Sequence, residues 1–407
     1  MDEQFLSKSS RSLEKSQIQK SLQTPYDPKL ISFALGMPST DLLPLEQYKS
    51  ALQNVLSQSS LQYSPPNAAL KAQIVDLMIK RNVFCNQNQV FLTSGAQQAM
   101  VLITKLLVDA GDDIIIDEAT YPGFIQIAQS MGANLVSIKT DIQDGISVEE
   151  LECYLQNCTS QNLKKPKFIY TMSEGHNPLS TSLSREKRLA LVSLASTYQI
   201  PIVEDDAYGF INYEQDITPP LKAYSNEWIF YIGSFSKILS PSTRIGWIIV
   251  PETLIEKLEI LKEATDINIA TFAQSIISSY IEMGYLNNHL SLIKEHYKEK
   301  RDTMVQALTQ YIPEIQFSIP KSGFFIWGRL PNHIDTNKLF KLSLETQKIS
   351  FIPGSAFSTG DTNHITNTPT NYLTNCLRLN FAFCPLDSIE IGIKRLSDAI
   401  KALEKYD

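Results

Sequence analysis

Between about residues 49 and 290 the sequence alternates short apolar runs, rich in β-branched residues, with longer segments of helical periodicity. Continuous apolar strands separated by helices are typical of a mostly parallel sheet that is buried on both faces. We therefore predict an α/β fold whose ligands bind beyond the carboxyl ends of the strands. The clearest strand candidates are Gln89–Thr93, Asp113–Asp117, Lys167–Thr171, Ile200–Glu204 and Trp228–Gly233.

The length of 407 residues exceeds what one hydrophobic core usually supports, so we expect two domains. Residues 49–290 form the predicted large domain and residues 291–407 a smaller α+β domain, with which the N-terminal segment 1–48 packs. A strongly helical stretch at about 255–311 leads from one domain to the other. In the small domain we expect two strands and a final amphipathic helix, at Gly323–Gly328, Cys376–Phe381 and about Ser388–Lys405.

The charge distribution and the cysteines exclude several classes of protein. The net charge is −7 and there is no basic tract, so neither nucleic acid nor an anionic membrane is an expected partner. The five cysteines form no Cys-x-x-Cys pair, which indicates reduced thiols in a cytoplasm and neither a disulfide framework nor a metal site. The N-terminus is polar, and no apolar run is long enough to span a bilayer. We expect a cytoplasmic protein.

The most specific chemistry lies at residues 233–246, where Lys237 stands near Ser234 and Ser236 and Arg244 follows seven residues later. A lysine amine can form a Schiff base with a carbonyl cofactor. Hydroxyls and a guanidinium supply the donors that phosphate oxygens need. The combination suits an aldehyde cofactor with a phosphate, although a string of serines and a lysine also occurs by chance in turns.

Two further motifs follow predicted strands. In Glu204-Asp-Asp-Ala-Tyr208, a carboxylate at the strand end can keep the ring nitrogen of a pyridine cofactor protonated, although an acidic cluster can also be a solvated turn. In Thr93-Ser-Gly-Ala-Gln-Gln98, small residues before a helix expose backbone N–H groups that stabilise a phosphate. The alternative for the second motif is an ordinary N-cap made by Ser94.

Three more motifs each have a plain structural alternative. Tyr121-Pro-Gly123 can be ordinary loop chemistry, and Arg378 between leucines can face solvent from a strand. In Ser173-Glu-Gly-His-Asn-Pro-Leu-Ser180, a buried Glu174 without a partner would be costly. It can contact a cationic substrate group, act as an extra acid or base, or pair with a structural partner. We place the structural pairing of Glu174 first, and we expect His176 to be a packing residue.

In order and spacing, these motifs together resemble the class I and II aminotransferase family of fold-type-I pyridoxal-phosphate enzymes. The resemblance runs from about residue 30 to the C-terminus. Later strings, such as Pro320-Lys-Ser-Gly-Phe-Phe-Ile-Trp327 and Phe351-Ile-Pro-Gly-Ser-Ala-Phe357, resemble the branch that contains 2-aminoadipate and broad-specificity aminotransferases. The resemblance implies a large domain with a mostly parallel seven-stranded sheet, and pyridoxal 5′-phosphate as the cofactor.

The resemblance also implies a role for each matching residue. Lys237 is the catalytic residue that holds the cofactor, Asp205 pairs with the ring nitrogen, and Tyr121 stacks on the ring. Tyr208 and Asn177 donate to the ring oxygen. The phosphate contacts expected within one chain are Gly95, Ala96, Gln97, Ser234, Ser236 and Arg244.

For the substrate, the resemblance implies that Arg378 grips the α-carboxylate, with Gly36 in the substrate loop and Asn177 beside it; Glu174 is the further candidate contact. Tyr63 resembles a tyrosine that reaches the phosphate of the neighbouring subunit, which implies a homodimer with shared active sites. The chain departs from the family pattern in two places. Ala96 replaces a common hydroxyl residue, and Leu179-Ser180 replaces Thr-Gly.

The function expected from these residues is transfer of the amino group of an amino acid to a 2-oxo acid, with ping-pong kinetics. One alternative is a specialised enzyme on the same scaffold that eliminates, cyclises or oxidises an amino acid, for example a cationic one. Another is a non-catalytic protein that uses the fold to bind an effector, although the chain has no room for an added DNA-binding domain. The spacing of motifs does not determine which amino acid is used.

Overall fold

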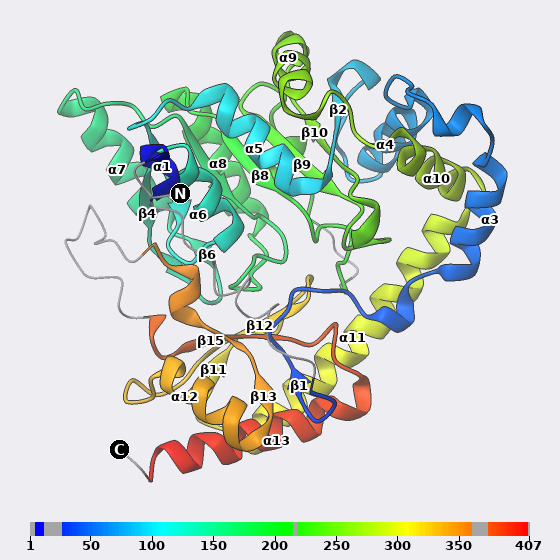
Figure 1. The fold of residues 1–407 in the computed structure, drawn as a ribbon. Helices are drawn as coiled ribbons and strands as arrows, with labels where there is room; N and C mark the ends of the chain where they lie inside the picture. The colour runs from blue at the N-terminus through cyan, green and yellow to red at the C-terminus, as the bar shows by residue number, and fades with distance from the viewer. Residues whose placement is uncertain (1–4, 12–26, 215–217, 360–372, 406–407) are drawn as a thin grey trace.

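The computed structural model describes residues 5–11, 27–214, 218–359 and 373–405. Its larger part is built on a seven-stranded sheet in the order β2-β10-β9-β8-β7-β3-β4 (Figure 1). All neighbouring strands are parallel except β10, which is antiparallel to both of its neighbours. The predicted α/β class with a mostly parallel sheet is therefore confirmed. The strands are β2 (Val90–Thr93), β3 (Asp113–Asp117), β4 (Asn134–Ile138), β7 (Phe168–Thr171), β8 (Ile202–Asp205), β9 (Ile229–Ser234) and β10 (Gly246–Ile249).

Helices cover both faces of this sheet because the strands present apolar side chains in both directions. In β3, Ile114 and Ile116 pack on one face with the helices α5 and α6, whereas Ile115 packs on the other with α7 and α8. This is the two-residue alternation of a strand, buried on both sides. The helices on the first face are α5 (Gly95–Leu107), α6 (Pro122–Ser130) and α9 (Ile255–Asp266), and those on the second are α7 (Val148–Ser160) and α8 (Arg185–Tyr198).

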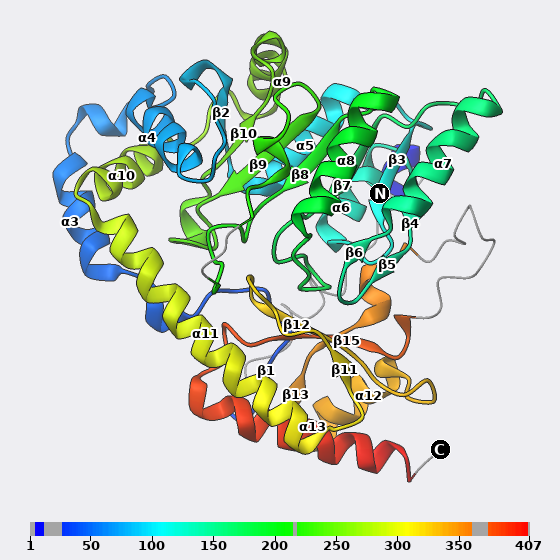
Figure 2. The same cartoon turned by 180° about the vertical axis from the view of Figure 1, so that it is seen from behind.

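Beyond the β2 edge of the sheet, a group of helices packs together (Figure 1). It consists of α3 (Leu45–Val55), α4 (Ala68–Ile79) and α10 (Thr271–Glu282). The stretch that was predicted to be helical at about 255–311 consists of three helices, of which α11 (Tyr285–Tyr311) is the longest. Figure 2 shows α11 running unbroken from the larger part of the molecule to the smaller one.

The smaller part contains a four-stranded antiparallel sheet in the order β11-β12-β15-β14. The short strand β1 (Ile31–Ser32) pairs with β13 (Ile349–Ser350), which holds the N-terminal segment beside this part. The predicted domain boundaries stay a prediction, and α11 continues through the expected boundary at 290. The elements here are β11 (Gln316–Phe317), β12 (Phe325–Arg329), α12 (Thr336–Leu342), β14 (Ile352–Pro353), β15 (Cys376–Asn380) and α13 (Leu386–Leu403).

A few short elements complete the described chain. The one-turn helix α1 (Lys8–Arg11) lies against α6 of the larger part, and β5 (Thr140–Asp141) pairs with β6 (Gly145–Ile146). Across the described ranges, no helix has both the length and the apolar character that crossing a membrane requires.

Candidate active site

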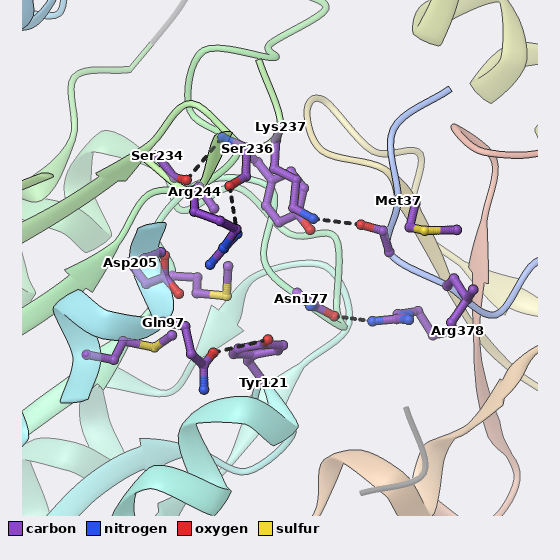
Figure 3. A pocket seen from close by; sticks show the side chains of 17 residues that line it. Met37, Gln97, Tyr121, Asn177, Asp205, Ser234, Ser236, Lys237, Arg244 and Arg378 are labelled. Atoms are coloured by element: carbon purple, nitrogen blue, oxygen red, sulfur yellow. Dashed lines mark hydrogen bonds between the residues drawn. The ribbon is translucent and has the colours of Figure 1, made fainter. Parts of the chain in front are cut away.

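A cavity of about 380 Å³ lies beyond the carboxyl ends of the central strands, where the two parts of the molecule meet. In Figure 3, Lys237, Asp205 and Tyr121 reach it from the larger part, whereas Arg378 enters from the smaller one. Twelve predicted site residues line it: Gly36, Ala96, Gln97, Tyr121, Asn177, Asp205, Tyr208, Ser234, Ser236, Lys237, Arg244 and Arg378. The structure thus brings together residues that are more than three hundred positions apart in the chain.

Lys237 follows the end of β9 and extends its amine into the cavity. Its Nζ donates a hydrogen bond to the carbonyl oxygen of Gly36 at 2.7 Å. Burial, and then the positive charges of Arg378 and Arg244, lower the pKa of the Lys237 amine to about 8. More of the amine is therefore neutral near neutral pH than for an ordinary lysine, and both a nucleophile and a general base require the neutral form.

Asp205 is the last residue of β8 and is 3 % exposed. Its Oδ2 accepts a hydrogen bond from the hydroxyl of Tyr170 at 2.8 Å, whereas its Oδ1 has no hydrogen-bond partner among the described residues. Burial raises the pKa of Asp205 to about 6, and the Tyr170 hydrogen bond opposes that rise. A buried carboxylate oxygen without a donor is suited to a protonated ring nitrogen.

The acidic neighbours of Asp205 have structural partners. Glu204 accepts from the backbone N–H groups of residues 221 and 222, at 2.7 and 3.0 Å. Asp206 accepts from the hydroxyl of Tyr231 at 2.8 Å and pairs with Arg81. Among the residues that line the cavity, Asp205 is the only acidic one. The alternative of a solvated acidic turn is wrong, since all three carboxylates are buried.

The start of α5 forms one wall of the cavity. Ser94 is the N-cap residue, but its side chain makes no capping hydrogen bond, so the ordinary N-cap expected as an alternative is not formed. Gly95 has a φ of +75°, and a Cβ there would lie 2.6 Å from Nη2 of Arg244. Glycine therefore lets the guanidinium approach the positive end of the helix, where an anion is stabilised.

Hydroxyl groups complete this wall. Arg244 donates from Nη1 to Oγ of Ser236 at 3.3 Å and from Nη2 to the carbonyl of Ser94 at 3.2 Å. The Ser234 hydroxyl oxygen accepts from the backbone N–H of Ser236 at 3.1 Å. Guanidinium, hydroxyl and helix N-terminus together form a set of donors that fits a phosphate group.

Arg378 lies in β15 and is 1 % exposed, so the alternative of a solvent-facing strand position is wrong. It donates from Nη1 to Oδ1 of Asn177 at 2.7 Å and from Nη2 to the carbonyl of Ala34 at 2.6 Å. Its guanidinium lies over the Phe325 ring, 4.1 Å from the centroid. Arg378 forms no ion pair within the described ranges, although a buried unpaired charge is costly. Burial lowers the pKa of this guanidinium to about 10.

Two tyrosines and an amide supply further donors around the cavity. Tyr121 donates from its hydroxyl to Oε1 of Gln97 at 3.4 Å. Tyr208 packs edge-on against the ring of Phe325. Burial raises the pKa of both phenols, so both stay protonated and remain hydrogen-bond donors. Asn177 accepts from Arg378 through Oδ1, which leaves its Nδ2 as the donating end of the amide.

Glu174 does not line the cavity, although the sequence made it a candidate substrate contact. Its Oε2 accepts from Nη2 of Arg188 at 2.6 Å, and its Oε1 accepts from Ser182 and Ser322 at 2.6 and 2.7 Å. Asn212 donates to the same Oε1 at 3.2 Å. These contacts favour the structural alternative, and we leave Glu174 out of the proposed site.

Three other predicted positions lie outside the cavity lining or beside it. Gly95 lies behind the lining, where it makes room for Arg244. Tyr63 is 89 % exposed and lies with Ile267 at a different hollow. His176 is buried, with Nε2 3.3 Å from Oδ2 of Asp117. Within a single chain, Tyr63 therefore contributes nothing to the cavity.

Tyr170 and the apolar part of the lining were not predicted to belong to the site. Tyr170 lies in a predicted strand, but the sequence of residues 167–171 does not show that Asp205 of the neighbouring strand will lie within reach of its hydroxyl. The apolar lining residues belong to no recognisable motif, and only their location in the fold places them at the cavity. It comprises Leu35, Met37, Met100, Met172 and Ala207.

Comparisons with known proteins identify the family of the chain. The family model for aminotransferase class I and II matches residues 28–396. An aromatic-amino-acid aminotransferase of Thermococcus litoralis is 33 % identical over 407 residues, which cover 98 % of this chain and 94 % of the relative. The crystal structure of a kynurenine aminotransferase from Pyrococcus horikoshii, in complex with PMP, matches with a TM-score of 0.90 and 32 % identity, covering 98 % of both chains. The alpha-aminoadipate aminotransferase of Thermus thermophilus, complexed with N-(5′-phosphopyridoxyl)-L-leucine, matches with a TM-score of 0.87 and 26 % identity, covering 99 % of this chain and 98 % of the other.

Proposed function

Because the chain belongs to the class I and II aminotransferase family, and is thus a pyridoxal-phosphate-dependent enzyme of amino-group transfer, we propose that the cavity around Lys237 is its active site. One observation carries this proposal. Three cationic side chains line the cavity: Arg378 is buried, Lys237 is half-buried and Arg244 is exposed, and among the described residues that line it Asp205 is the one carboxylate. None of the three cations forms an ion pair with a described residue. This excess of positive charge favours anionic ligands, and a phosphate at Arg244 and a substrate carboxylate at Arg378 would match it.

The donors and acceptors of the cavity fit pyridoxal phosphate. The wall formed by α5, Ser234, Ser236 and Arg244 offers donors for a phosphate, and Oδ1 of Asp205 is a buried acceptor without a partner. When bound, the cofactor supplies an aldehyde that combines with amines and a ring that accepts negative charge from the substrate Cα. Ala96 brings no hydroxyl to the phosphate wall, so backbone N–H groups and Gln97 would take that contact.

Lys237 would perform two tasks with one atom. Its Nζ, whose pKa is lowered by burial and by two arginines, would hold the cofactor and would also be placed to move a proton at the substrate Cα. Asp205 would hold the proton on the ring nitrogen, and Tyr208 and Asn177 would donate to the ring oxygen. Tyr121 would pack against the ring, which fixes its plane.

Arg378 would hold the α-carboxylate of the substrate. Its Nη1 and Nη2 already donate to Asn177 and to the carbonyl of Ala34, so the guanidinium is fixed in orientation before a ligand arrives. Its Nε has no hydrogen-bond partner among the described residues. A preoriented guanidinium selects the planar carboxylate shared by amino acids and 2-oxo acids. Gly36, whose carbonyl accepts from Lys237, would lie at the same end of the substrate.

The alternative of elimination, cyclisation or oxidation was motivated by Glu174 and by Leu179-Ser180. Glu174 has four donors outside the cavity, and the hydroxyl of Ser180 donates to the carbonyl of Phe325 at 2.7 Å. Neither residue lines the cavity. Amino-group transfer is therefore the reaction that the site supports best.

The test is a stoichiometric half-reaction. The purified enzyme, loaded with pyridoxal phosphate, is incubated with a panel of amino acids without a 2-oxo acid, and the products are identified by mass spectrometry. We expect about one 2-oxo acid per active site, and repeated turnover only after a second 2-oxo acid is added. Sustained turnover of one amino acid without an acceptor would contradict the proposal and favour the specialised enzyme.

We further propose a cytoplasmic homodimer in which each subunit completes the other's site. Tyr63 supports the dimer, since it is 89 % exposed beside two other exposed apolar residues, Leu61 and Ile267. The cytoplasmic location is supported by the five free cysteines. Light scattering gives the mass in solution, and a Tyr63→Phe variant that weakens cofactor binding in the dimer would support a contact with the partner's phosphate.

A further inference from the structure

The carboxylate of Asp205 has two unlike oxygens, and one residue outside the predicted site makes them unlike. Oδ2 accepts from the hydroxyl of Tyr170 at 2.8 Å, and Oδ1 has no partner among the described residues. A free carboxylate can rotate and exchange its oxygens, whereas one held at Oδ2 keeps Oδ1 in a fixed direction. The hydroxyl of Tyr170 thus fixes the orientation of the Asp205 carboxylate.

The sheet explains why Tyr170 reaches this carboxylate. In the parallel pair of β7 and β8, Tyr170 lies opposite Val203, and Asp205 is two residues beyond Val203. Side chains two residues apart in a strand point to the same face, so Tyr170 and Asp205 are diagonal neighbours on one face of the sheet. A single step in register would turn the tyrosine toward the opposite face.

The phenol itself is held rigidly. Tyr170 is fully buried, and its ring stacks on Phe124 of α6 with centroids 3.7 Å apart and an interplanar angle of 4°. Phe124 packs in turn against Phe168, which is also in β7. The hydroxyl therefore has little freedom to leave Asp205, and burial keeps the Tyr170 pKa well above its ordinary value, so it remains a donor.

We propose that Tyr170 is a positioning residue of the transamination site, which aims Oδ1 of Asp205 at the ring nitrogen of the cofactor and keeps this carboxylate ionised. The proposal rests on the proposed function, because it requires Asp205 to pair with the cofactor. Tyr170 itself does not line the cavity and touches no substrate.

The charges around Asp205 show what the hydroxyl must oppose. Burial raises the pKa of Asp205, and the negative charge of Asp206 at the end of β8 raises it further. The Tyr170 hydrogen bond from β7, the backbone N–H of Ala207 and the charge of His176 lower it. The phenols of Tyr121 and Tyr208 and the Lys237 amine also face this carboxylate. Of these groups, Tyr170 is the one side chain for which a direct hydrogen bond to Asp205 is observed.

The chain offers a matched control for removing this hydroxyl. Tyr231 is also fully buried, also lies in the central sheet, and also donates to a carboxylate at 2.8 Å, but that carboxylate is Asp206, which lies outside the cavity lining. Tyr170→Phe and Tyr231→Phe each delete a phenol that donates to a carboxylate, and Tyr231→Phe also removes the oxygen that accepts from Nη1 of Arg81 at 2.9 Å. If Tyr170 has only a structural role, both variants should bind the cofactor equally well. If it has a positioning role, only Tyr170→Phe should weaken cofactor binding.

The experiment compares the two variants with the wild-type enzyme in the dissociation constant for pyridoxal phosphate. The measurement is repeated with an analogue in which a carbon replaces the ring nitrogen. We expect Tyr170→Phe to weaken binding of pyridoxal phosphate about tenfold, as for a lost hydrogen bond to a charged group. Binding of the analogue should change much less. Tyr231→Phe should bind both compounds as the wild type does, although its loss of thermal stability should be at least as large as that of Tyr170→Phe because the Arg81 contact is lost too.

The pH profile supplies the second readout. Because Asp205 must be ionised, kcat/KM falls as the pH drops through its pKa, and loss of the hydroxyl should move this acidic limb upward by about one pH unit. Equal dissociation constants and equal acidic limbs in the two variants would overturn the inference. Failure of the wild-type enzyme itself to bind pyridoxal phosphate through Lys237 would instead overturn the proposed site.

A substitution that keeps the ring covers the case in which Tyr170→Phe does not fold. Replacing Tyr170 by 3,5-difluorotyrosine keeps the shape of the side chain but makes the phenol a stronger donor. The acidic limb should then move to lower pH, opposite to the effect of removing the hydroxyl. An unchanged limb in a folded, fully loaded enzyme would count against the positioning role.

Discussion

Two polar regions of this molecule differ in how well their charges are matched. The first is the cavity, with Lys237, Arg244, Arg378 and Asp205. The second, which we call the support cluster, consists of Glu174, Arg188, Ser182, Asn212 and Ser322. In the support cluster Glu174 pairs with Arg188 at 2.6 Å and accepts three further hydrogen bonds. In the cavity, no cation has an acidic partner among the described residues. Burial alone therefore does not identify a functional group; a charged group that both lines the cavity and has no oppositely charged partner is the better candidate.

The same contrast occurs within the string Glu204-Asp205-Asp206. The outer two carboxylates accept from backbone N–H groups or from Tyr231 and Arg81, and neither lines the cavity. Asp205 lines the cavity and keeps one oxygen without a donor. Each of the following substitutions tests whether unmatched groups perform the chemistry and matched ones support the fold.

The largest effect is expected at Lys237. Lys237→Ala removes the amine proposed to bind the cofactor and to move the proton, so transamination should fall by at least about 10⁴-fold. The absorbance of covalently held cofactor should disappear, while thermal stability changes little. Full turnover in this variant would show that the cavity is not the active site.

The support cluster should respond in stability and not in catalysis. Glu174→Gln keeps the shape of the side chain but leaves Arg188 buried without its ion-pair partner, which should lower the free energy of unfolding by about 3–5 kcal/mol. Urea unfolding measures this loss, and Ser182→Ala, which deletes a single hydrogen bond to Glu174, is the milder control at about 1–3 kcal/mol. A large fall in kcat of the folded Glu174→Gln enzyme would bring Glu174 back into the active site.

Arg378 tests the cavity, where charged groups lack oppositely charged partners. Arg378→Lys keeps a positive charge but loses the planar fork, so kcat/KM for the amino acid should fall about 100-fold, mostly through KM. Cofactor absorbance should persist, because Arg378 lies at the substrate end of the cavity. An unchanged KM would mean that another group binds the substrate carboxylate.

The smallest effect concerns the charge on Lys237. Burial and two arginines lower the pKa of this amine to about 8, so the neutral fraction grows as the pH rises through about 8, well below the usual range of lysine. The rate at which the cofactor-free enzyme takes up pyridoxal phosphate should increase over the same range. Because burial is the larger cause, Arg378→Leu should move this midpoint upward by less than about one unit. A midpoint near 10 in the unaltered enzyme would show that the amine is not held in this environment.

Much of the fold was predictable because its elements are local patterns. The apolar runs predicted five of the seven strands of the main sheet to within two residues, and the periodicity of the C-terminal segment predicted α13. The strand β10 was not singled out, although its antiparallel direction completes the sheet. It is short and follows the Lys237 segment closely, and a four-residue apolar run does not reveal which strands it will pair with.

Some residues of the site were likewise predictable from the sequence and others were not. Lys237, Asp205 and Arg378 were named from motifs, because a Schiff-base lysine, a ring-nitrogen acid and a carboxylate-binding arginine are recognisable residue types in a recognisable order. Glu174 and Tyr170 show the limit. The sequence left Glu174 with a structural and two functional alternatives, and the contacts of the fold favour the structural one. Tyr170 was predicted only as a strand residue, yet its hydroxyl contacts Asp205.

The sequence by itself determined the α/β class, which follows from periodicity along one dimension, and the family and the cofactor, which follow from the resemblance of its ordered motifs to the aminotransferase family. Only the tertiary structure decided which polar groups are matched. Hydrogen bonds such as Tyr170 to Asp205 and Arg188 to Glu174 join positions 35 and 14 residues apart, through strand register and helix placement. Whether a buried group is free to meet a ligand depends on such partners, and these are set by packing in three dimensions.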